Sequence, residues 1–587
     1  MKLNYFGKNT VLKMVYFFSF TLICIISSGF LGSRANAGHI LKIGLMDEPK
    51  TLNIWLARDK WSGRVLSLMY QRLYIRDPDT LALIPWLAEK DPVYDETTVS
   101  YTVKLRPAKW SDGSEFTSED VAFTGRLIQE FKIPTYQARW KFVKKIETPD
   151  KRTVRFYLEK PMAVFTTRTL TSPIVQKKEW ARVVEKARKS EKPLTTLQNH
   201  KIEIPVGTGP FVLKEWRQGA FLFVQKNKHF FGTGQKICGR MLGPNIDGII
   251  FKFFGTSDAA VLALKKGTMD MFWSGIQPGY LEDLKNEPGI RLFSNKRSAL
   301  YYWGFNLRKL PFSDVNLRRA VATLIDKDFI ITRIVQGRAT RMDSVIPPGN
   351  KFWLCADLPR YGAGLTRPER IKKAHEILKK AGYTWEVPPV NEAGEVVRGE
   401  EIRLPNGEPM KKFTILTPPA DYDPLRAMSG MIIQEWLKEI GISVSAKPMA
   451  FGSLIQQVNY QHDFDAFIMA YGRLDLDPDW VRKFFHSGQD KKRGGNKAGY
   501  RNPEFDRISD ESAATMDKEK RQKLIREMQR IILRDVPYIP LYTPDLIEAV
   551  REDKFAGWVE TLEGIGNIWS FCELKPVSYT HLRAHET

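Results

Sequence analysis

The sequence has 587 residues and a formal net charge of +23, from 90 lysines and arginines against 67 acids. A hydrophobic fraction of 43% with 15 tryptophans excludes a chain that is disordered as a whole, since it is ample for large cores. The basic residues are scattered among acids, and the longest runs, such as Lys491-Lys492-Arg493, are short. We therefore interpret the charge as a solvated basic surface and expect no nucleic-acid partner.

The N-terminus has the pattern of a secretory signal. Lys2, Lys8 and Lys13 precede an apolar stretch over 15–30, and Ala35-Asn36-Ala37 has the spacing that a signal peptidase cleaves. The alternative is a membrane anchor, but the stretch is near the lower limit for spanning a bilayer of about 30 Å. Cys24 lacks the small residues expected just before a lipidated cysteine, so the sequence does not indicate a lipoprotein. We therefore predict a signal peptide over 1–37 and a mature chain with a charge of +19.

Four segments carry helix signals and alternate with strand-like runs. Thr117 and Thr366 each precede an acid by three residues, as in a capping box, and two further helices are predicted from Pro424 to Ile440 and from Asp517 to the residue before Pro537. Strands are predicted over 41–46, 100–105, 153–158, 221–225, 249–253, 413–417, 442–446 and 466–469. This mixture predicts an α/β or α+β architecture.

Two segments stand apart from this pattern. Residues 388–412 are polar and turn-rich, which predicts a hairpin insertion. The last residues, 575–587, show no apolar periodicity from Val577 onward and contain two of only eight histidines. We interpret 575–587 as a tail foreign to the fold.

The mature chain contains Cys238, Cys355 and Cys572, with no paired spacing of the metal-binding kind. One disulfide could form in an oxidising compartment, and the sequence does not indicate which two cysteines would pair. We expect no cofactor and no metal.

No motif for hydrolytic catalysis is present in the sequence, neither G-x-S-x-G nor H-E-x-x-H. The most prominent acidic cluster runs from Leu474 to Trp480, with acids at 475, 477 and 479. A calcium loop would need glycine and glutamate where Trp480 and His486 stand, so that interpretation fails. Two interpretations remain open: a solvated turn with capping acids, or a carboxylate offered to a cationic ligand group beside Tyr471 and Trp480.

Several motifs in a fixed order resemble those of a known family. They are LRPAKWSDGSEFTSEDVAFT (105–124), GTGPFVLKEW (207–216), LKKGTMDMFW (264–273), FNLRKLPFSDVNLRRAVATLIDKDFI (305–330), AGYTW (381–385), LKEIGISV (437–444) and RQKLIREMQRIILRDVPYIPLY (521–542). Each motif alone is weak, but their order and spacing are specific. Over residues 40–570 the chain resembles the family 5 extracellular solute-binding proteins, the oligopeptide-, dipeptide- and nickel-binding group that serves ABC importers.

The resemblance implies an α/β fold of two lobes and a hinge, as in type II periplasmic binding proteins, plus an extra third domain. Carried onto this chain, the first lobe comprises residues 38–72, 207–300 and 535–574, the extra domain 73–206, and the second lobe 301–534. Such lobes close on a ligand by hinge bending.

The resemblance also implies ligand-binding residues at the junction of the lobes. The candidates are Asp475, Asp477, Tyr471, Trp480, Tyr302, Trp303, Asn306 and Trp273. In peptide-binding relatives an aspartate in the region that corresponds to residues 471–480 grips the α-amino group of the peptide. Asp475 falls one position from where that aspartate would sit. Core packing is the commoner role for any single aromatic residue.

The function that follows is capture of a small solute, a peptide above all, by an exported monomer that delivers it to the permease of an ABC importer. Nickel complexes, sugars and other small solutes remain open. A secreted hydrolase that uses Asp475 and Asp477 as a carboxylate pair is one alternative, because residues two apart on a strand share a face. A basic surface protein that binds an anionic polymer is the other.

We predict cleavage after Ala37, because the Ala-x-Ala spacing follows an apolar stretch. N-terminal sequencing of the protein secreted by a bacterial host should begin at Gly38. An uncleaved Met1 start found in the membrane fraction would contradict this prediction.

Overall fold

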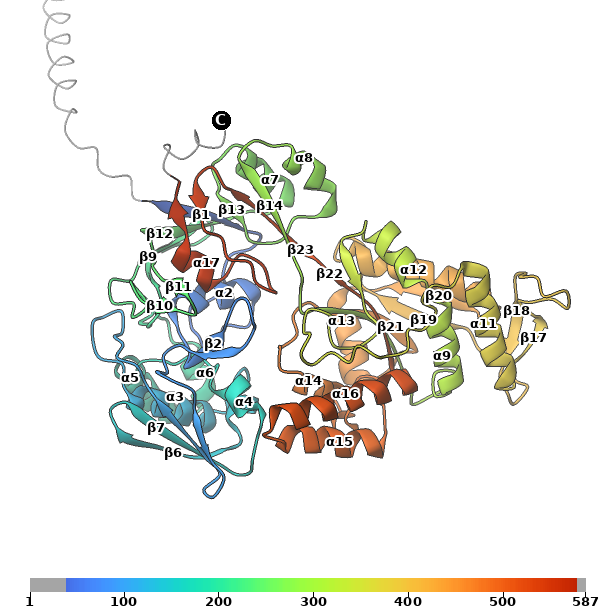
Figure 1. Ribbon diagram of the computed structural model, residues 1–587, viewed down its shortest axis with the longest axis horizontal. Helices are drawn as coiled ribbons and strands as arrows, with labels where there is room; N and C mark the ends of the chain where they lie inside the picture. Colours follow the sequence, from blue (N-terminus) through green and yellow to red (C-terminus); the bar gives the residue numbers. More distant parts are fainter. Residues whose placement is uncertain (1–38, 578–587) are drawn as a thin grey trace, which may run out of the picture.

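The computed structural model describes residues 39–577 and folds them into two lobes, with a third domain joined to the first lobe (Figure 1). Each lobe is built on one large mixed sheet with helices around it. This is the two-lobed α/β architecture with an extra domain that the sequence predicts. The signal peptide predicted over 1–37 lies outside the described residues.

The first lobe contains a seven-stranded sheet of order β14-β23-β13-β1-β12-β9-β8. Its strands are β1 (Ile40–Leu45), β8 (Phe211–Arg217), β9 (Phe221–Lys226), β12 (Gly248–Phe253), β13 (Met271–Phe272), β14 (Ile290–Asn295) and β23 (Leu546–Arg551). β1 pairs in parallel with both β12 and β13, so it lies at the centre. The helices of this lobe are α2 (Lys60–Met69), α7 (Ser257–Lys265), α8 (Leu281–Lys285) and α17 (Ile568–Glu573).

The extra domain has a four-stranded antiparallel sheet of order β4-β5-β7-β6. Its elements are β4 (Val93–Asp95), β5 (Ser100–Lys104), β6 (Val143–Asp150), β7 (Thr153–Leu158), α3 (Ser118–Glu130), α4 (Gln137–Trp140) and α5 (Lys177–Arg188). One continuous hydrophobic core runs through this domain and the first lobe. The two therefore behave as a single body.

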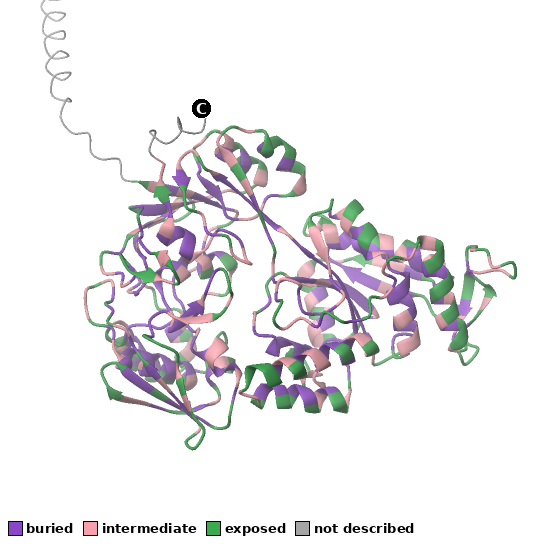
Figure 2. Ribbon diagram, in the orientation of Figure 1, coloured by how far each residue is buried: buried purple, intermediate pink, exposed green. Residues whose placement is uncertain are grey.

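The second lobe contains a six-stranded sheet of order β16-β22-β15-β21-β19-β20. Its strands are β15 (Leu300–Phe305), β16 (Ala339–Arg341), β19 (Phe413–Thr417), β20 (Val444–Pro448), β21 (Ala466–Tyr471) and β22 (Tyr538–Pro544). Its main helices are α9 (Val315–Leu324), α11 (Arg367–Lys380), α12 (Pro424–Lys438), α14 (Asp479–Phe485), α15 (Pro503–Ala514) and α16 (Lys518–Asp535). Two separate cores fill the two faces of this sheet. Its central strands are mostly buried (Figure 2).

Two strand-to-strand connections join the lobes. The chain passes from β14 to β15 through residues 296–299, and it returns from β22 to β23 through Asp545 alone. β22 lies within the segment 535–574 assigned to the first lobe from the resemblance, but it pairs with β15 and β16 of the second. The crossover is therefore about ten residues later than predicted, because β22 and β23 form a nearly continuous ribbon across both sheets.

Local sequence signals account for the helices that the sequence predicts. Thr117 and Thr366 each form a reciprocal capping box, with Asp120 and Glu369 respectively, and Asp517 caps α16. Gly441 follows α12 with a φ of +79°, a conformation that glycine adopts at little cost at a helix end. Residues 388–412 lie around the hairpin of β17 (Thr384–Val387) and β18 (Glu400–Arg403), as the turn signals predict.

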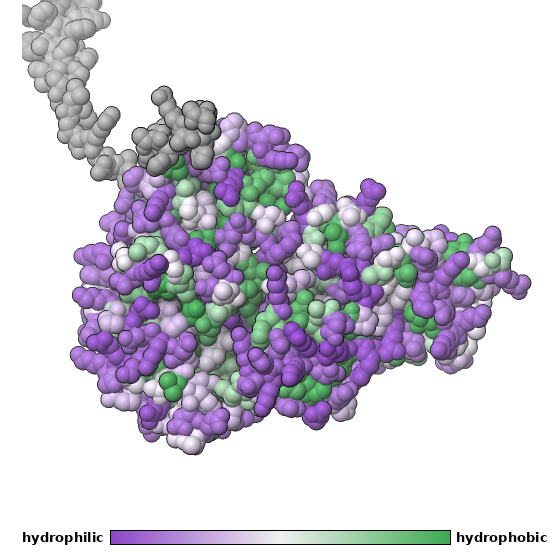
Figure 3. All heavy atoms as spheres, viewed as in Figure 1, coloured by the Kyte–Doolittle hydropathy of each residue, from purple (hydrophilic) through white to green (hydrophobic). Residues whose placement is uncertain are grey.

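The three cysteines, Cys238, Cys355 and Cys572, are all free thiols. Between residues 39 and 577, no helix is both long and apolar enough to span a bilayer. Hydrophilic residues cover most of the face seen in Figure 3.

The fold extends slightly past its predicted end. Lys575 and Pro576 form β25, which pairs with β24 (Phe555–Ala556), and the amide of Val577 donates to the carbonyl of Lys554 at 2.9 Å. The boundary of 575 therefore falls three residues early.

We predict that a chain ending at Val577 has the melting temperature of the full-length protein, because residues 578–587 carry no core pattern. A chain ending at Leu574 serves as the matched control and should melt lower, since it loses the β24–β25 pairing. Differential scanning calorimetry decides. A clear loss of melting temperature on removing 578–587 alone would contradict the prediction.

Candidate functional site

The two lobes meet on the side opposite the hinge through polar contacts of the extra domain. The hydroxyl of Thr167 donates to Asp477 at 2.9 Å, and Arg168 donates to Asp479 at 2.7 Å. The amide of Ala163 donates to the carbonyl of Ala513 at 3.1 Å. Together with the strand connections, these contacts enclose the space between the lobes from two sides.

The acidic loop between β21 and α14 is held in one conformation by its own side chains. Asp475 accepts a hydrogen bond from the amide of Asp477, and Asp477 accepts one from the amide of Asp479, both at 3.1 Å. The indole of Trp480 donates to the carbonyl of Asp475 at 3.0 Å. Aspartates commonly stabilise turns by such bonds to the amide two residues on.

Asp477 is buried and fully engaged by protein groups. Arg521 of α16 grips its two oxygens at 2.7 and 2.8 Å, in addition to the bond from Thr167. Burial opposes ionisation of this carboxyl, but Arg521 outweighs it and lowers the pKa of Asp477. The carboxylate is therefore ionised and has little acceptor capacity left for a ligand.

Asp475 differs from its neighbour in exposure. Its side chain is open to solvent and has no ion-pair partner within 4.0 Å among residues 39–577. Its negative charge partly offsets the lowering by burial of the pKa of Arg76 and of Arg139. These two arginines lie on the opposite side of the interlobe space. Of the two predicted anchors, Asp475 alone presents a free carboxylate.

The aromatic candidates of the second lobe lie in its cores. Tyr302 is fully buried between Tyr471 and Tyr538, with ring centroids 5.5 and 4.4 Å away. Trp303 is also fully buried, but it points to the other face of the sheet, because successive strand residues alternate. Trp480 is buried beside Phe484. In this structure Tyr302, Tyr471 and Trp480 form the wall behind the acidic loop rather than an open surface.

The remaining candidates are also held by the protein. The amide of Asn306 donates to the carbonyls of His462 and Phe464, at 3.2 and 2.9 Å. Trp273 is buried in the first lobe, and the guanidinium of Arg64 lies 4.6 Å from its ring centroid. Contact of Asn306 or Trp273 with a ligand stays a prediction. Of the two, Trp273 is next to the interlobe space, because Arg64 lies against its ring.

Basic residues that the sequence did not single out line this space. Lys60 and Arg64 lie one turn apart on α2, and Arg72 and Arg76 follow that helix. Arg139 comes from α4 of the extra domain, and Arg473 from the acidic loop of the second lobe. We call these six residues, Lys60, Arg64, Arg72, Arg76, Arg139 and Arg473, the recess cations.

Five of the recess cations, all but Arg473, are reached by solvent although much protein surrounds them. Lys60 is exposed, yet burial among protein atoms, helped by the nearby charge of Arg64, lowers its pKa to about 7. Burial also lowers the pKa of Arg64 and of Arg72 to about 10 each, and charge from Arg473 contributes to both shifts. Because the charge of Arg473, from the second lobe, acts on Arg64 and Arg72 across the interlobe space, we call the space between these residues the recess.

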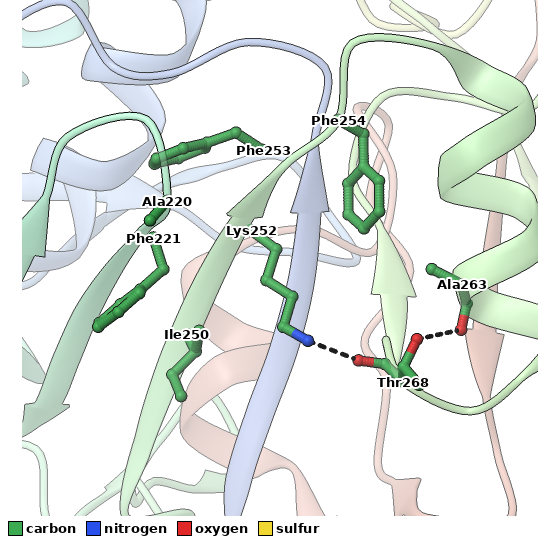
Figure 4. Close-up of a pocket in the computed structure, with 8 residues that line it drawn as sticks. All are labelled: Ala220, Phe221, Ile250, Lys252, Phe253, Phe254, Ala263 and Thr268. Atoms are coloured by element: carbon green, nitrogen blue, oxygen red, sulfur yellow. Dashed lines mark hydrogen bonds between the residues drawn. The ribbon is translucent and has the colours of Figure 1, made fainter.

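A second hollow lies away from this recess, on the first lobe. It has a volume of about 400 Å³ and is lined by residues of β9, β12 and α7, among them Phe221, Lys252 and Ala263 (Figure 4). Its lysine donates to the carbonyl of Thr268 at 3.1 Å, so its main polar group is already satisfied. None of the predicted site residues lines it, and we do not regard it as the site.

Metal binding has no support in the described residues. Across 39–577 no group of three or more histidine, cysteine, aspartate or glutamate side chains is placed to hold a metal ion.

Comparison with known proteins identifies the family. Residues 82–493 match the family described as "Bacterial extracellular solute-binding proteins, family 5 Middle". The chain belongs to this family.

Its relatives include proteins named for binding peptides. The chain is 26% identical over 529 residues to the oligopeptide-binding protein AppA of Bacillus subtilis, covering 89% of each chain. It is 26% identical over 494 residues to the di/tripeptide-binding protein 1 of Pseudomonas aeruginosa, covering 80% of this chain and 82% of the relative. A periplasmic oligopeptide-binding protein of an ABC transporter of Thermotoga maritima shares the fold, with a TM-score of 0.76 at 23% identity, over 93% of this chain and 100% of that one.

We predict that Asp477→Asn destabilises the second lobe by about 3–5 kcal/mol, because it leaves the buried guanidinium of Arg521 without its counter-charge. Asp475→Asn is the matched control, since it removes the same charge from an exposed position, and it should change the free energy of unfolding by less than about 0.5 kcal/mol. Chemical denaturation followed by tryptophan fluorescence measures both. Equal stability of the two variants would contradict a structural role for Asp477.

Proposed function

We propose that this chain captures a peptide in the recess between its two lobes and delivers it, without catalysis, to the permease of an ABC importer. We further propose that it acts as a monomer outside the cytoplasmic membrane, after removal of its signal peptide. Family membership supports the transport role, and the names of the peptide-binding relatives support the choice of solute.

The observation that carries the choice of site is that the unpaired carboxylate of Asp475 lies across the recess from cations. A peptide has an ammonium group at one end and a carboxylate at the other, so its site needs an acceptor and donors within reach of one another. Asp475 supplies an exposed carboxylate, and Arg76 and Arg139 supply charges from the opposite wall. The aromatic wall of Tyr302, Tyr471 and Trp480 stands behind the loop that presents Asp475.

The two alternatives are less well supported. A carboxylate-pair hydrolase would need both Asp475 and Asp477 free to act on a substrate, but Arg521 occupies both oxygens of Asp477. A polymer-binding surface would need cations on an open face, whereas the recess cations lie between lobes that touch on two sides. Incubation with mixed peptides separates the cases, since a binder retains peptides unchanged and a hydrolase cleaves them.

We predict that Asp475→Asn weakens peptide binding by about 1.5–3 kcal/mol, or roughly ten- to a hundredfold, since it removes a charge-assisted bond to the ammonium group. Asp463→Asn is a suitable control, because Asp463 is an exposed acid of the same lobe with no ion pair in the described chain. Isothermal titration calorimetry with the peptides retained from the mixture measures the loss. Binding of Asp475→Asn within twofold of wild type would place the ammonium site elsewhere.

A further inference from the structure

The recess cations come from three parts of the chain that are distant in sequence. Arg64 of the first lobe and Arg473 of the second lie close enough for their charges to interact, and so do Arg72 and Arg139 of the extra domain. Arg297, in the connection between the lobes, adds a further positive charge near Lys60 and Arg64. Positive charge therefore comes from both lobes, from the extra domain and from the connection between the lobes.

These cations lack the carboxylate counter-ions that several other enclosed arginines of this protein have. Arg521 pairs with Asp477, Arg341 with Asp343 and Arg426 with Asp423, each at 3.0 Å or less. Within residues 39–577, no carboxylate lies within 4.0 Å of any recess cation. Arg64, Arg72, Arg76 and Arg139 are partly buried, and charges in such positions are normally paired, so their lack of a counter-ion requires an explanation.

Few hydrogen bonds join the recess cations to protein groups. Arg64 donates to the carbonyl of Trp273, and Arg76 donates to the carbonyl of Leu81 at 3.1 Å. The side chains of the other four, Lys60, Arg72, Arg139 and Arg473, donate to no group of the described chain. Lys60 and Arg139 instead lie over the rings of Trp61 and Tyr136, with 4.3 and 5.9 Å to the centroids.

The acids near the recess are too few to balance it. Asp475 is exposed in the recess, and Glu563 already accepts the amide of Ser298 at 2.9 Å. Glu548 is fully buried in the first lobe and accepts the amide of Ile565 at 2.6 Å. Burial raises the pKa of Glu548 to about 7, so this acid carries only part of a charge at neutral pH.

We propose that the solute held in this recess bears at least two negatively charged groups, as an acidic peptide or a non-peptide polycarboxylate does. This inference rests on the solute-binding function proposed above and narrows its substrate class. A neutral peptide offers one carboxylate to five arginines and to Lys60, which is partly charged at neutral pH because its pKa is about 7. An anionic solute supplies the missing counter-charges and relieves the repulsion among like charges that the closed lobes bring together.

The test uses four probes on protein freed of co-purified solute by unfolding and refolding: triglutamate, trialanine, trilysine and citrate. Calorimetry should show that triglutamate binds at least tenfold more tightly than trialanine and that trilysine does not bind. Citrate has no ammonium group for Asp475, so its affinity relative to triglutamate distinguishes the two sources of carboxylate. Tight binding of citrate, with no binding of the three peptides, would support an anionic solute and contradict the proposal that the solute is a peptide.

Variants test whether the recess cations are responsible. Arg72→Gln and Arg139→Gln should each weaken binding of the preferred anion at least tenfold. Arg182→Gln removes the same charge from an exposed position on α5 that has no ion pair in the described chain, and it should stay within twofold of wild type. Circular dichroism confirms that each variant is folded.

Three results would overturn the inference. Trialanine or trilysine binding as tightly as triglutamate would do so while leaving peptide capture intact, and so would unchanged anion binding in both recess variants. No binding of any probe, with no solute found by native mass spectrometry of the protein before refolding, would overturn the proposed function as well.

Discussion

The buried ion pair of Asp477 and Arg521 is the interaction on which the interlobe architecture depends. It connects the loop after β21 to the long helix α16. The same carboxylate accepts a hydrogen bond from the hydroxyl of Thr167 in the extra domain. Desolvating such a pair is costly, and the bidentate geometry with two further donors makes the arrangement favourable. With Asp477 fixed, Asp475 is presented to solvent two residues earlier, on the recess side.

The distribution of cores indicates where the molecule can move. The first lobe and the extra domain share one large core, beside a smaller one in the first lobe, whereas the second lobe has two cores of its own. Relative motion of the lobes therefore requires bending at the two connections, residues 296–299 and Asp545. It also requires the polar contacts of Thr167 and Arg168 to change. Contacts of this kind break and re-form more readily than packed apolar ones, which suits hinge closure around a solute. Closure also brings the positive walls together, so it is favoured when a counter-charge lies between them.

Local chemistry made much of the fold predictable from the sequence. Capping boxes at Thr117 and Thr366 and alternation over 153–158 depend on near neighbours, and the structure has these elements where the sequence predicts them. The position of β22 depends instead on partners more than 200 residues away in β15 and β16, and the sequence assigned it to the wrong lobe. The order of the lobes along the chain was predicted from the family resemblance, because composition and periodicity give no information about it.

The site was less predictable for the same reason. Asp475 and Asp477 look alike in sequence, and only the position of Arg521, 44 residues later, separates an exposed carboxylate from a buried one. Tyr302 and Trp303 are adjacent aromatics, but the strand sends them into different cores. The recess cations stand singly between positions 60 and 473, and a single basic residue resembles a solvated surface residue until the fold gathers several together.

The central claim is that one solute contacts both lobes within the recess. Hydrogen exchange measured by mass spectrometry, with and without a mixed peptide pool, tests it most directly. The account predicts slower exchange in segments of both walls at once, covering 60–76, 137–140 and 471–480. Protection confined to one lobe, or to the pocket around Lys252, would contradict it.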